Sequence, residues 1–228
     1  MNCLIYRLET GGNFLKGRSF CPHCKHTLDW QDLIPILSFV FLRGRCRYCQ
    51  KKISIQYPLL ELFTGMIFVL AFWHFGLGFG LIFGFLISSL LIVIFVYDLK
   101  HYIIPDSIVF TAIIIAAIFN FKLLNFASAL GAAGFFLIIV LVSRGKWMGV
   151  GDIKLAFLMG LMLGFPGILV ALFLAFSVGA IIGTGLMIFG KKTIKSEVPF
   201  GPFLVGGTFI ALFWGEAIAQ WYLQFTLF

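Results

Sequence analysis

The stretch FGLIFGFLISSLLIVIFVYDLK, residues 79–100, decides the class of fold. Its residues 79–97 are almost wholly apolar, and their length is close to the ~20 residues that a helix needs to cross the hydrocarbon of a bilayer. The whole chain of 228 residues has the same character, with 61% hydrophobic and 11% charged residues. A soluble domain averages about 45–50% apolar and about 25% charged residues, because its outside must face water. The sequence therefore predicts an all-α membrane protein of several spans.

The apolar runs after residue 57 set the number of predicted helices. They lie at about 58–75, 79–97, 107–121, 126–143, 154–164, 167–190 and 199–223. We therefore expect about seven transmembrane helices, of which the short fifth run needs support from its neighbours. Residues 1–57, in contrast, are polar and contain two tight cysteine pairs. The chain is thus predicted to have a Cys-rich module over 1–57 and a transmembrane domain over 58–228.

The positions of the basic residues predict the orientation. If residues 1–57 face the cytoplasm and the runs alternate, every Lys and Arg except Lys122 falls on the cytoplasmic side or at its edge. Such an excess is typical of the cytoplasmic loops of membrane proteins. We expect a multi-pass protein of the inner or plasma membrane, with its Cys module in the cytoplasm. The net charge of +8 then reflects the orientation of the chain in the membrane. The expected partner is the lipid bilayer, and no nucleic acid is expected.

The cysteine pairs predict a metal site. Cys21 and Cys24 are separated by 21 residues from Cys46 and Cys49, which gives two C-x2-C knuckles. Two such knuckles commonly supply four thiolates to one tetrahedral zinc. A redox site needs only one pair, and disulfides are disfavoured in a reducing cytoplasm. We therefore predict a structural zinc that holds the module together.

Three carboxylates lie at the predicted cytoplasmic boundary, namely Asp98, Asp106 and Asp152. Asp98 ends an apolar run, where the negative end of the helix dipole disfavours it, so either a function or an ion pair with Lys100 must account for it. Asp106 follows Pro105 at a helix start, which suits an acidic side chain, and a structural role explains it equally well.

Asp152 has two interpretations. It suits the N-cap of a helix that begins at Ile153. However, Gly149 and Gly151 precede it in the segment MGVGDIKLAF, residues 148–157. Glycines allow backbone conformations and close approaches that other residues forbid. We expect them to let an extended substrate lie beside the carboxylate.

Two carboxylates from different helices at the same membrane depth match the needs of an aspartic protease. Held close together they share a proton, so that one activates water and the other protonates the developing oxyanion. A transporter with a carboxylate proton relay is the alternative, and it predicts acidic groups nearer the bilayer midplane. A membrane-anchored zinc module with structural aspartates is a second alternative.

At these residues the sequence resembles the prepilin peptidases, which are GxGD intramembrane aspartic proteases. VYDLKHYIIPD (96–106) and GVGDIK (149–154) are similar to the two catalytic motifs, and CPHC and CRYC are similar to the double-CxxC module of the family. The resemblance implies that Asp98 and Asp152 are catalytic. It also implies supporting motif positions at Pro105, Asp106, Gly149, Gly151 and Lys154.

The resemblance further implies a function. It is the removal of the short basic leader from type IV prepilins or pilin-like pseudopilins at the cytoplasmic face, by the transmembrane protease domain. N-methylation of the new N-terminus with S-adenosylmethionine is a second implied activity, although the sequence has no Gly-rich signature for this cofactor. NCLIYRLE, residues 2–9, is similar to a segment that follows a first transmembrane helix in the family. Either the numbering starts at an internal methionine, or the protein lacks one span and an eight-helix parent has seven helices here.

Overall fold

The computed structural model describes residues 2–10, 18–120, 122–188 and 198–226, and these form two compact units, Met1–Leu70 and Ala71–Phe228. Nearly all of the regular structure is helical. Within the described ranges no β-strand forms, and only two isolated β-bridges occur. The all-helical fold predicted from the apolar runs is therefore confirmed.

The N-terminal unit contains short helices and the start of a long one. Its elements are α1 (Asn2–Thr10), the 3-10 helix η1 (Trp30–Leu33), α2 (Leu37–Phe41) and the first part of α3 (Gln56–Phe75). The two β-bridges, Phe20 with Thr27 and Arg45 with Lys52, each close a small loop around one cysteine pair. The division between the units falls inside α3, after Leu70, whereas the sequence predicted a domain boundary at residue 57.

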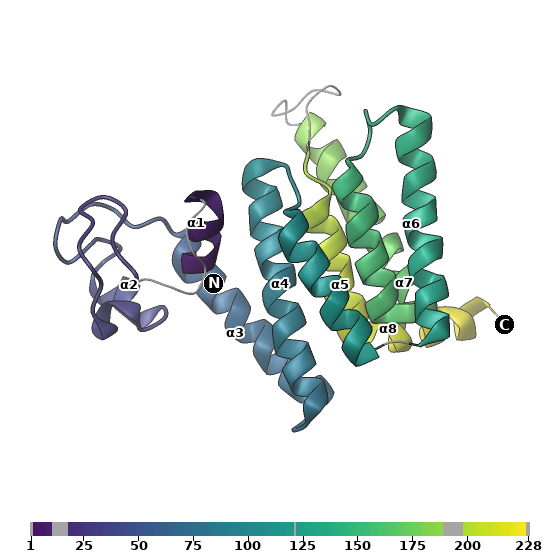
Figure 1. The fold of residues 1–228 in the computed structure, drawn as a ribbon, viewed down its shortest axis with the longest axis horizontal. Coiled ribbons are helices and arrows are strands. Elements are labelled where there is room, and N and C mark those ends of the chain that lie inside the picture. The colour runs from purple at the N-terminus through teal and green to yellow at the C-terminus, as the bar shows by residue number, and fades with distance from the viewer. Residues whose placement is uncertain (1, 11–17, 121, 189–197, 227–228) are drawn as a thin grey trace. The chain divides into compact units, whose positions relative to one another are not determined.

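The second unit is a helix bundle. It contains α4 (Phe79–His101), α5 (Asp106–Asn120), α6 (Leu123–Ser143), α7 (Val150–Ile188) and α8 (Gly201–Thr226). The C-terminal ends of α4 and α6 and the N-terminal ends of α5, α7 and α8 lie together at one end of the bundle (Figure 1). Asp98 and Asp152 both belong to this end, because they lie in the last turns of α4 and the first turn of α7.

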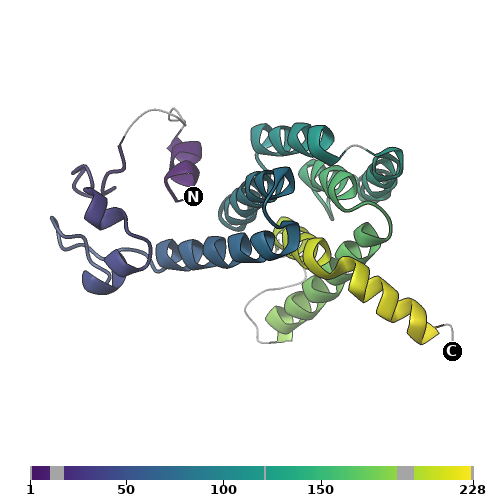
Figure 2. The same ribbon diagram turned by 90° about the horizontal axis from the view of Figure 1, so that it is seen from below.

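Helix α7 consists of two helical segments. Gly164 (φ 60°, ψ −169°) and Phe165 (φ −91°, ψ 137°) leave the helical conformation, and Pro166 follows them. Glycine suits Gly164 because its φ lies in the left-handed region, and proline has no N–H with which to continue the helix. The two segments correspond to the predicted runs 154–164 and 167–190. The first lies beside both α5 and α6 (Figure 2).

Two asparagines bind the carbonyls that this break leaves without helical partners. The Asn120 side chain donates to the Met162 carbonyl at 2.8 Å, and the Asn125 side chain donates to the Leu161 carbonyl at 3.2 Å. Unpaired backbone groups are costly at membrane depth, so side chains must satisfy them where a helix breaks. These contacts are the support from neighbours that the short run 154–164 was expected to need, and they come from α5 and α6.

Small residues let the helices approach closely. A Cβ atom at Gly160 would overlap the backbone of Ala129 on α6, and one at Gly207 of α8 would overlap the Ala171 carbonyl of α7. Close backbone approach of this kind is a common basis of helix association in membranes. Among the larger side chains, Phe136 is fully buried and packs against Phe176.

Five of the described helices, α3, α4, α6, α7 and α8, are long and apolar enough to cross a membrane, and α5 is shorter. This confirms a membrane protein of several helical spans, while the number of seven spans stays a prediction. Two helices begin a few residues before the positions predicted from the apolar runs. Helix α6 begins at Leu123 and not at 126, and α7 begins at Val150 and not at 154. Hydropathy misses such first turns, because polar and glycine residues are accepted there.

Candidate active site and metal centre

The two candidate catalytic carboxylates come together at one end of the bundle. Asp98 is 4% exposed and Asp152 is 7% exposed, so both are buried. They come from α4 and α7, yet they are close enough for their negative charges to act on each other. Buried carboxylates are rare unless they are paired or functional.

Asp152 is held by the turn that starts α7. The backbone N–H of Gly149 donates to Asp152 Oδ2 at 3.1 Å, and the Asp152 N–H donates to the Gly149 carbonyl at 3.2 Å. Because α7 begins at Val150, Asp152 lies inside the first turn and reaches back to the residue before the helix. The prediction that Asp152 precedes a helix starting at Ile153 was therefore wrong. The Asp152 carboxylate still accepts the backbone N–H of the residue before the helix, as the side chain at position N3 of a capping box does.

The two glycines before Asp152 serve different purposes. A Cβ atom at Gly151 would lie 3.0 Å from Cβ of Ile104, so the absence of a side chain lets Ile104 pack against α7. A Cβ atom at Gly149 would have no neighbour nearer than 3.9 Å, which is an ordinary van der Waals contact. Neither glycine has a left-handed φ. Of the two freedoms that glycine allows, the structure shows a close approach at Gly151, and the place of an extended substrate beside the carboxylate stays a prediction.

Asp98 is held by a residue that the sequence analysis missed. The backbone N–H of Gly201, the first residue of α8, hydrogen-bonds the Asp98 carboxylate. A Cβ atom at Gly201 would lie 2.5 Å from Asp98 Oδ2 and 3.4 Å from Cδ1 of Ile104. The available signal was the segment VPFGPF, residues 198–203, where glycine stands between two prolines at the edge of an apolar run.

Each aspartate thus accepts a glycine N–H at the start of a helix. The positive end of a helix dipole stabilises a nearby negative charge. Ile104 lies between Gly151 and Gly201 and is itself buried, so a single apolar side chain separates the two glycines. The arrangement thus places both carboxylates, Asp98 and Asp152, around Ile104 at one end of the bundle.

Asp106 and Lys154 form an ion pair next to this site. Lys154 Nζ lies 2.6 Å from Asp106 Oδ1, and the same Nζ lies 5.3 Å from the ring centroid of Phe110. Asp106 is the first residue of α5, and Pro105 accepts backbone hydrogen bonds from the first turn that follows it. The pair links the start of α5 to the first turns of α7. Because the Asp106 side chain is 61% exposed, this contact contributes little to stability.

The four cysteines of the two knuckles lie together. Their sulfur atoms are all within 4.8 Å of one another, and those of Cys21 and Cys49 are 3.9 Å apart. Four thiolates at about 2.3 Å from one zinc have sulfur–sulfur separations close to these values. The donor set therefore fits a closed tetrahedral site. The ring of His26 stacks on the ring of Tyr48, and the two ring centroids are 3.7 Å apart.

The two knuckles have the same backbone design. The Cys21 N–H donates to the His26 carbonyl, and the Cys46 N–H donates to the Lys51 carbonyl, each at 2.9 Å. Burial acts to raise the pKa of Cys21, but hydrogen bonds from the backbone of Cys24 and His23 outweigh it and lower the pKa to about 7. The thiolate form of Cys21 is therefore accessible near neutral pH, whereas burial raises the pKa of Cys46.

Comparisons with known proteins identify the family of the chain. Residues 1–75 match the model of the bacterial peptidase A24 N-terminal domain, and residues 85–184 match the type IV leader peptidase family. The chain belongs to the type IV leader peptidase family. Relatives named "Prepilin leader peptidase/N-methyltransferase" include those of Aeromonas hydrophila and Legionella pneumophila. They are 35% and 37% identical over 92% and 93% of this chain and over 76% and 78% of their own lengths.

A third relative of the same name, from Bacillus subtilis, is 35% identical over 92% of this chain and 87% of its own length. No solved structure matches the chain. Each matched region contains one of the two candidate sites. The first region covers the four cysteines, and the second covers both aspartates. Membership of a leader peptidase family gives no support to the transporter alternative.

Proposed function

We propose that this leader peptidase family member removes the short basic leader from type IV prepilins or pilin-like pseudopilins at the cytoplasmic face of the membrane. The observation that carries the proposal is the burial of two carboxylates from different helices, Asp98 and Asp152, at the same end of the bundle. The names of the relatives and the family match support the substrate class. The count of basic residues supports the cytoplasmic orientation.

The proposed mechanism uses the two carboxylates as one unit. The proposal has the two carboxyl groups share one proton, as the paired carboxylates of aspartic proteases do. The ionised group takes a proton from a water molecule, which attacks the carbonyl carbon of the scissile peptide bond. The protonated group donates to the oxygen of that carbonyl as negative charge develops on it. Gly149 and Gly201 keep each carboxylate in place through the backbone hydrogen bonds described above.

The remaining site residues have supporting roles in this proposal. Zinc at Cys21, Cys24, Cys46 and Cys49 would stabilise the Cys module and take no part in cleavage, because four sulfurs leave no open position on the metal. Pro105, Asp106, Gly151 and Lys154 would fix the starts of α5 and α7 around the carboxylates.

A second proposed activity is the N-methylation of the new N-terminus, with S-adenosylmethionine as the donor. The names of the relatives support it. The two activities are separable by experiment. Asp152→Asn protein given a pilin that is already cleaved should still transfer labelled methyl groups, while the same protein leaves intact prepilin uncut. Loss of both activities in a folded Asp152→Asn protein would contradict this separation.

The test of cleavage uses purified full-length protein in lipid nanodiscs and a prepilin substrate. Asp98→Asn and Asp152→Asn should each abolish cleavage, because the amide cannot take part in acid–base catalysis. Asp106→Asn is the matched control at the same end of the bundle, and it should retain most of the activity. A stable Asp152→Asn protein that still cleaves prepilin would refute the protease assignment.

A further inference from the structure

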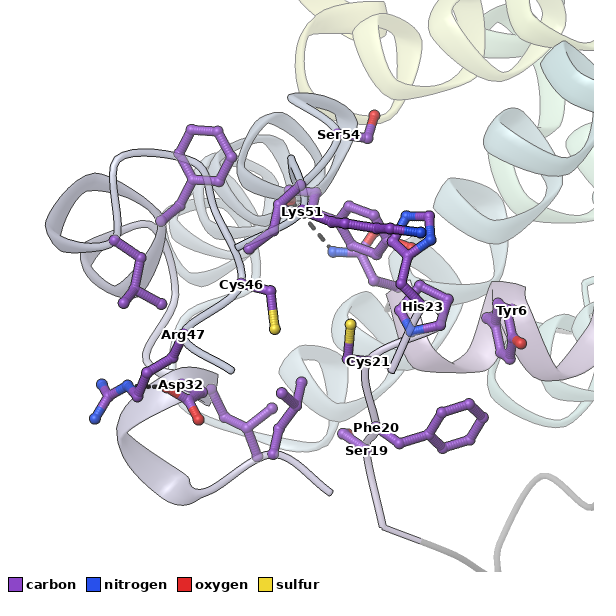
Figure 3. Close-up of a pocket in the computed structure, with 18 of the residues that line it drawn as sticks. Tyr6, Ser19, Phe20, Cys21, His23, Asp32, Cys46, Arg47, Lys51 and Ser54 are labelled. Atoms are coloured by element: carbon purple, nitrogen blue, oxygen red, sulfur yellow. Dashed lines mark hydrogen bonds and ion pairs between the residues drawn. The ribbon is translucent and has the colours of Figure 1, made fainter. Parts of the chain in front are cut away.

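The N-terminal unit contains a cavity of about 510 Å³ that the proposed cleavage does not use. It lies between α1, the two cysteine knuckles and the first turns of α3. Ligand sites in proteins commonly enclose about 300–1,000 Å³. In Figure 3 the sulfur atoms of Cys21 and Cys46 lie close together in its wall, with Lys51 on one side of them and the Arg47–Asp32 ion pair on the other.

The charges around the cavity favour an anion. Its walls include the cationic residues Arg7, Arg47, Lys51 and Lys52, and the two carboxylates Asp32 and Glu61. The carboxylates already have partners within the unit. Asp32 pairs with Arg47 at 3.0 Å, and Glu61 accepts the backbone N–H of Ile36 at 3.0 Å. Among the residues that the structure describes, Lys51 and Lys52 form no ion pair. The lining therefore has an excess of positive charge that a negatively charged ligand would neutralise.

The position and apolar content of the cavity favour a lipid as the source of that charge. Tyr57, Pro58 and Glu61 line it, and they belong to the first turns of α3, which is long and apolar enough to cross a membrane. Leu33, Phe39 and other apolar side chains line the remainder. Tyrosine and basic residues at the end of a membrane helix are typical of the lipid headgroup level. A ligand there needs an anionic phosphate group and an apolar body.

We infer that this cavity binds the phosphate headgroup of an anionic phospholipid, with Lys51 and Lys52 as its main cationic contacts and Arg7 as a further one. Each basic residue near a charged membrane surface strengthens the attraction. Bound lipid would fix the Cys module against the start of α3. The inference is independent of the proposed cleavage, because binding can be measured in protein with an inactive dyad.

The test measures lipid binding to the full-length protein in detergent by native mass spectrometry. Phosphatidylglycerol should bind roughly tenfold more tightly than zwitterionic phosphatidylcholine. The Lys51→Gln/Lys52→Gln variant should lose this preference. Arg144→Gln/Lys146→Gln removes the same charge from an exposed loop outside the cavity, and it should keep the preference. Zinc content and helical circular dichroism check that each variant is folded. If the double variant does not fold, Arg7→Gln removes another positive charge from the lining and should weaken the preference.

Two results would overturn the inference. Equal binding of the two lipids by wild-type protein would show that no anion-selective site exists. An equal loss of preference in the Arg144→Gln/Lys146→Gln control would show that general surface charge, and not the cavity, attracts the lipid. A third arm adds excess inorganic phosphate, which should leave phosphatidylglycerol bound. Complete displacement would identify a soluble phosphate compound as the ligand and reject the lipid source.

Discussion

The Cys module and the aspartate dyad both bring two short motifs together, but they do so by different means. In the module, each knuckle is built by hydrogen bonds between residues at most nine positions apart, and the two knuckles repeat the same design. In the dyad, each carboxylate depends on a glycine at the start of a helix, and for Asp98 that glycine lies on α8, far away in the sequence. Local spacing therefore defines the candidate metal site, whereas helix packing defines the candidate active site.

This contrast predicts that the dyad is most sensitive at Gly201. In Gly201→Ala the new Cβ atom would lie 2.5 Å from Asp98 Oδ2, so either the carboxylate or α8 must move. We expect the rate of prepilin cleavage to fall by at least about a hundredfold, because small displacements of a catalytic group cost this much. Gly206→Ala on the same helix meets nothing within 4 Å and is the matched control. Equal activity of the two variants would contradict the role of Gly201.

Substitutions in the Cys module should affect its metal content and its protection from proteolysis only where they remove a cysteine ligand. Metal analysis of the pure protein should find about one zinc per chain. Cys21→Ser should lose most of the metal and expose residues 20–52 to proteolysis, while His23→Ala keeps both the metal and the protection. Loss of zinc in His23→Ala, or full zinc in Cys21→Ser, would show that a different set of side chains binds the metal.

The two glycines of the GxGD segment should also differ in their sensitivity to substitution by alanine. Gly151→Ala would place a Cβ atom 3.0 Å from Ile104, which must then yield, so we expect a loss of activity of roughly tenfold. Gly149→Ala meets no atom nearer than 3.9 Å and should leave the protein as stable as wild type. The cleavage rate and the thermal unfolding of the two variants are measured in the same detergent and compared. A larger loss of stability at Gly149 than at Gly151 would reverse our assignment of their roles.

The ion pair beside the dyad should have the smallest effect. An exposed pair contributes about 0.2–1 kcal/mol, and Asp106 is 61% exposed. Asp106→Asn and Lys154→Gln should each lower the unfolding temperature by a few degrees at most, and the double variant should be no worse than the single ones. A double-mutant cycle on thermal stability and cleavage rate measures this coupling. A coupling energy well above ~1 kcal/mol would mean that the pair holds the site together.

The sequence was sufficient wherever the signal was local. The apolar runs predicted the helices, and the spacing of Cys21, Cys24, Cys46 and Cys49 predicted a cluster that the structure shows. It was insufficient where distant segments meet. The glycine between two prolines marks Gly201 as the edge of a helix, but its contact with Asp98 arises only when α8 is packed against α4. Asn120 and Asn125 were missed for the same reason, since their partners are carbonyls released by a break in another helix.

The central claim is that Asp98 and Asp152 act as one catalytic unit, and a double-mutant comparison of kcat/KM tests it most directly. Asp98→Asn and Asp152→Asn should each lower kcat/KM for prepilin cleavage by at least about a thousandfold, and the double variant should be no less active than either single one. Residues that act together show this strong non-additivity. If either single variant keeps most of its activity, or if the two losses multiply in the double variant, the two carboxylates do not form a dyad.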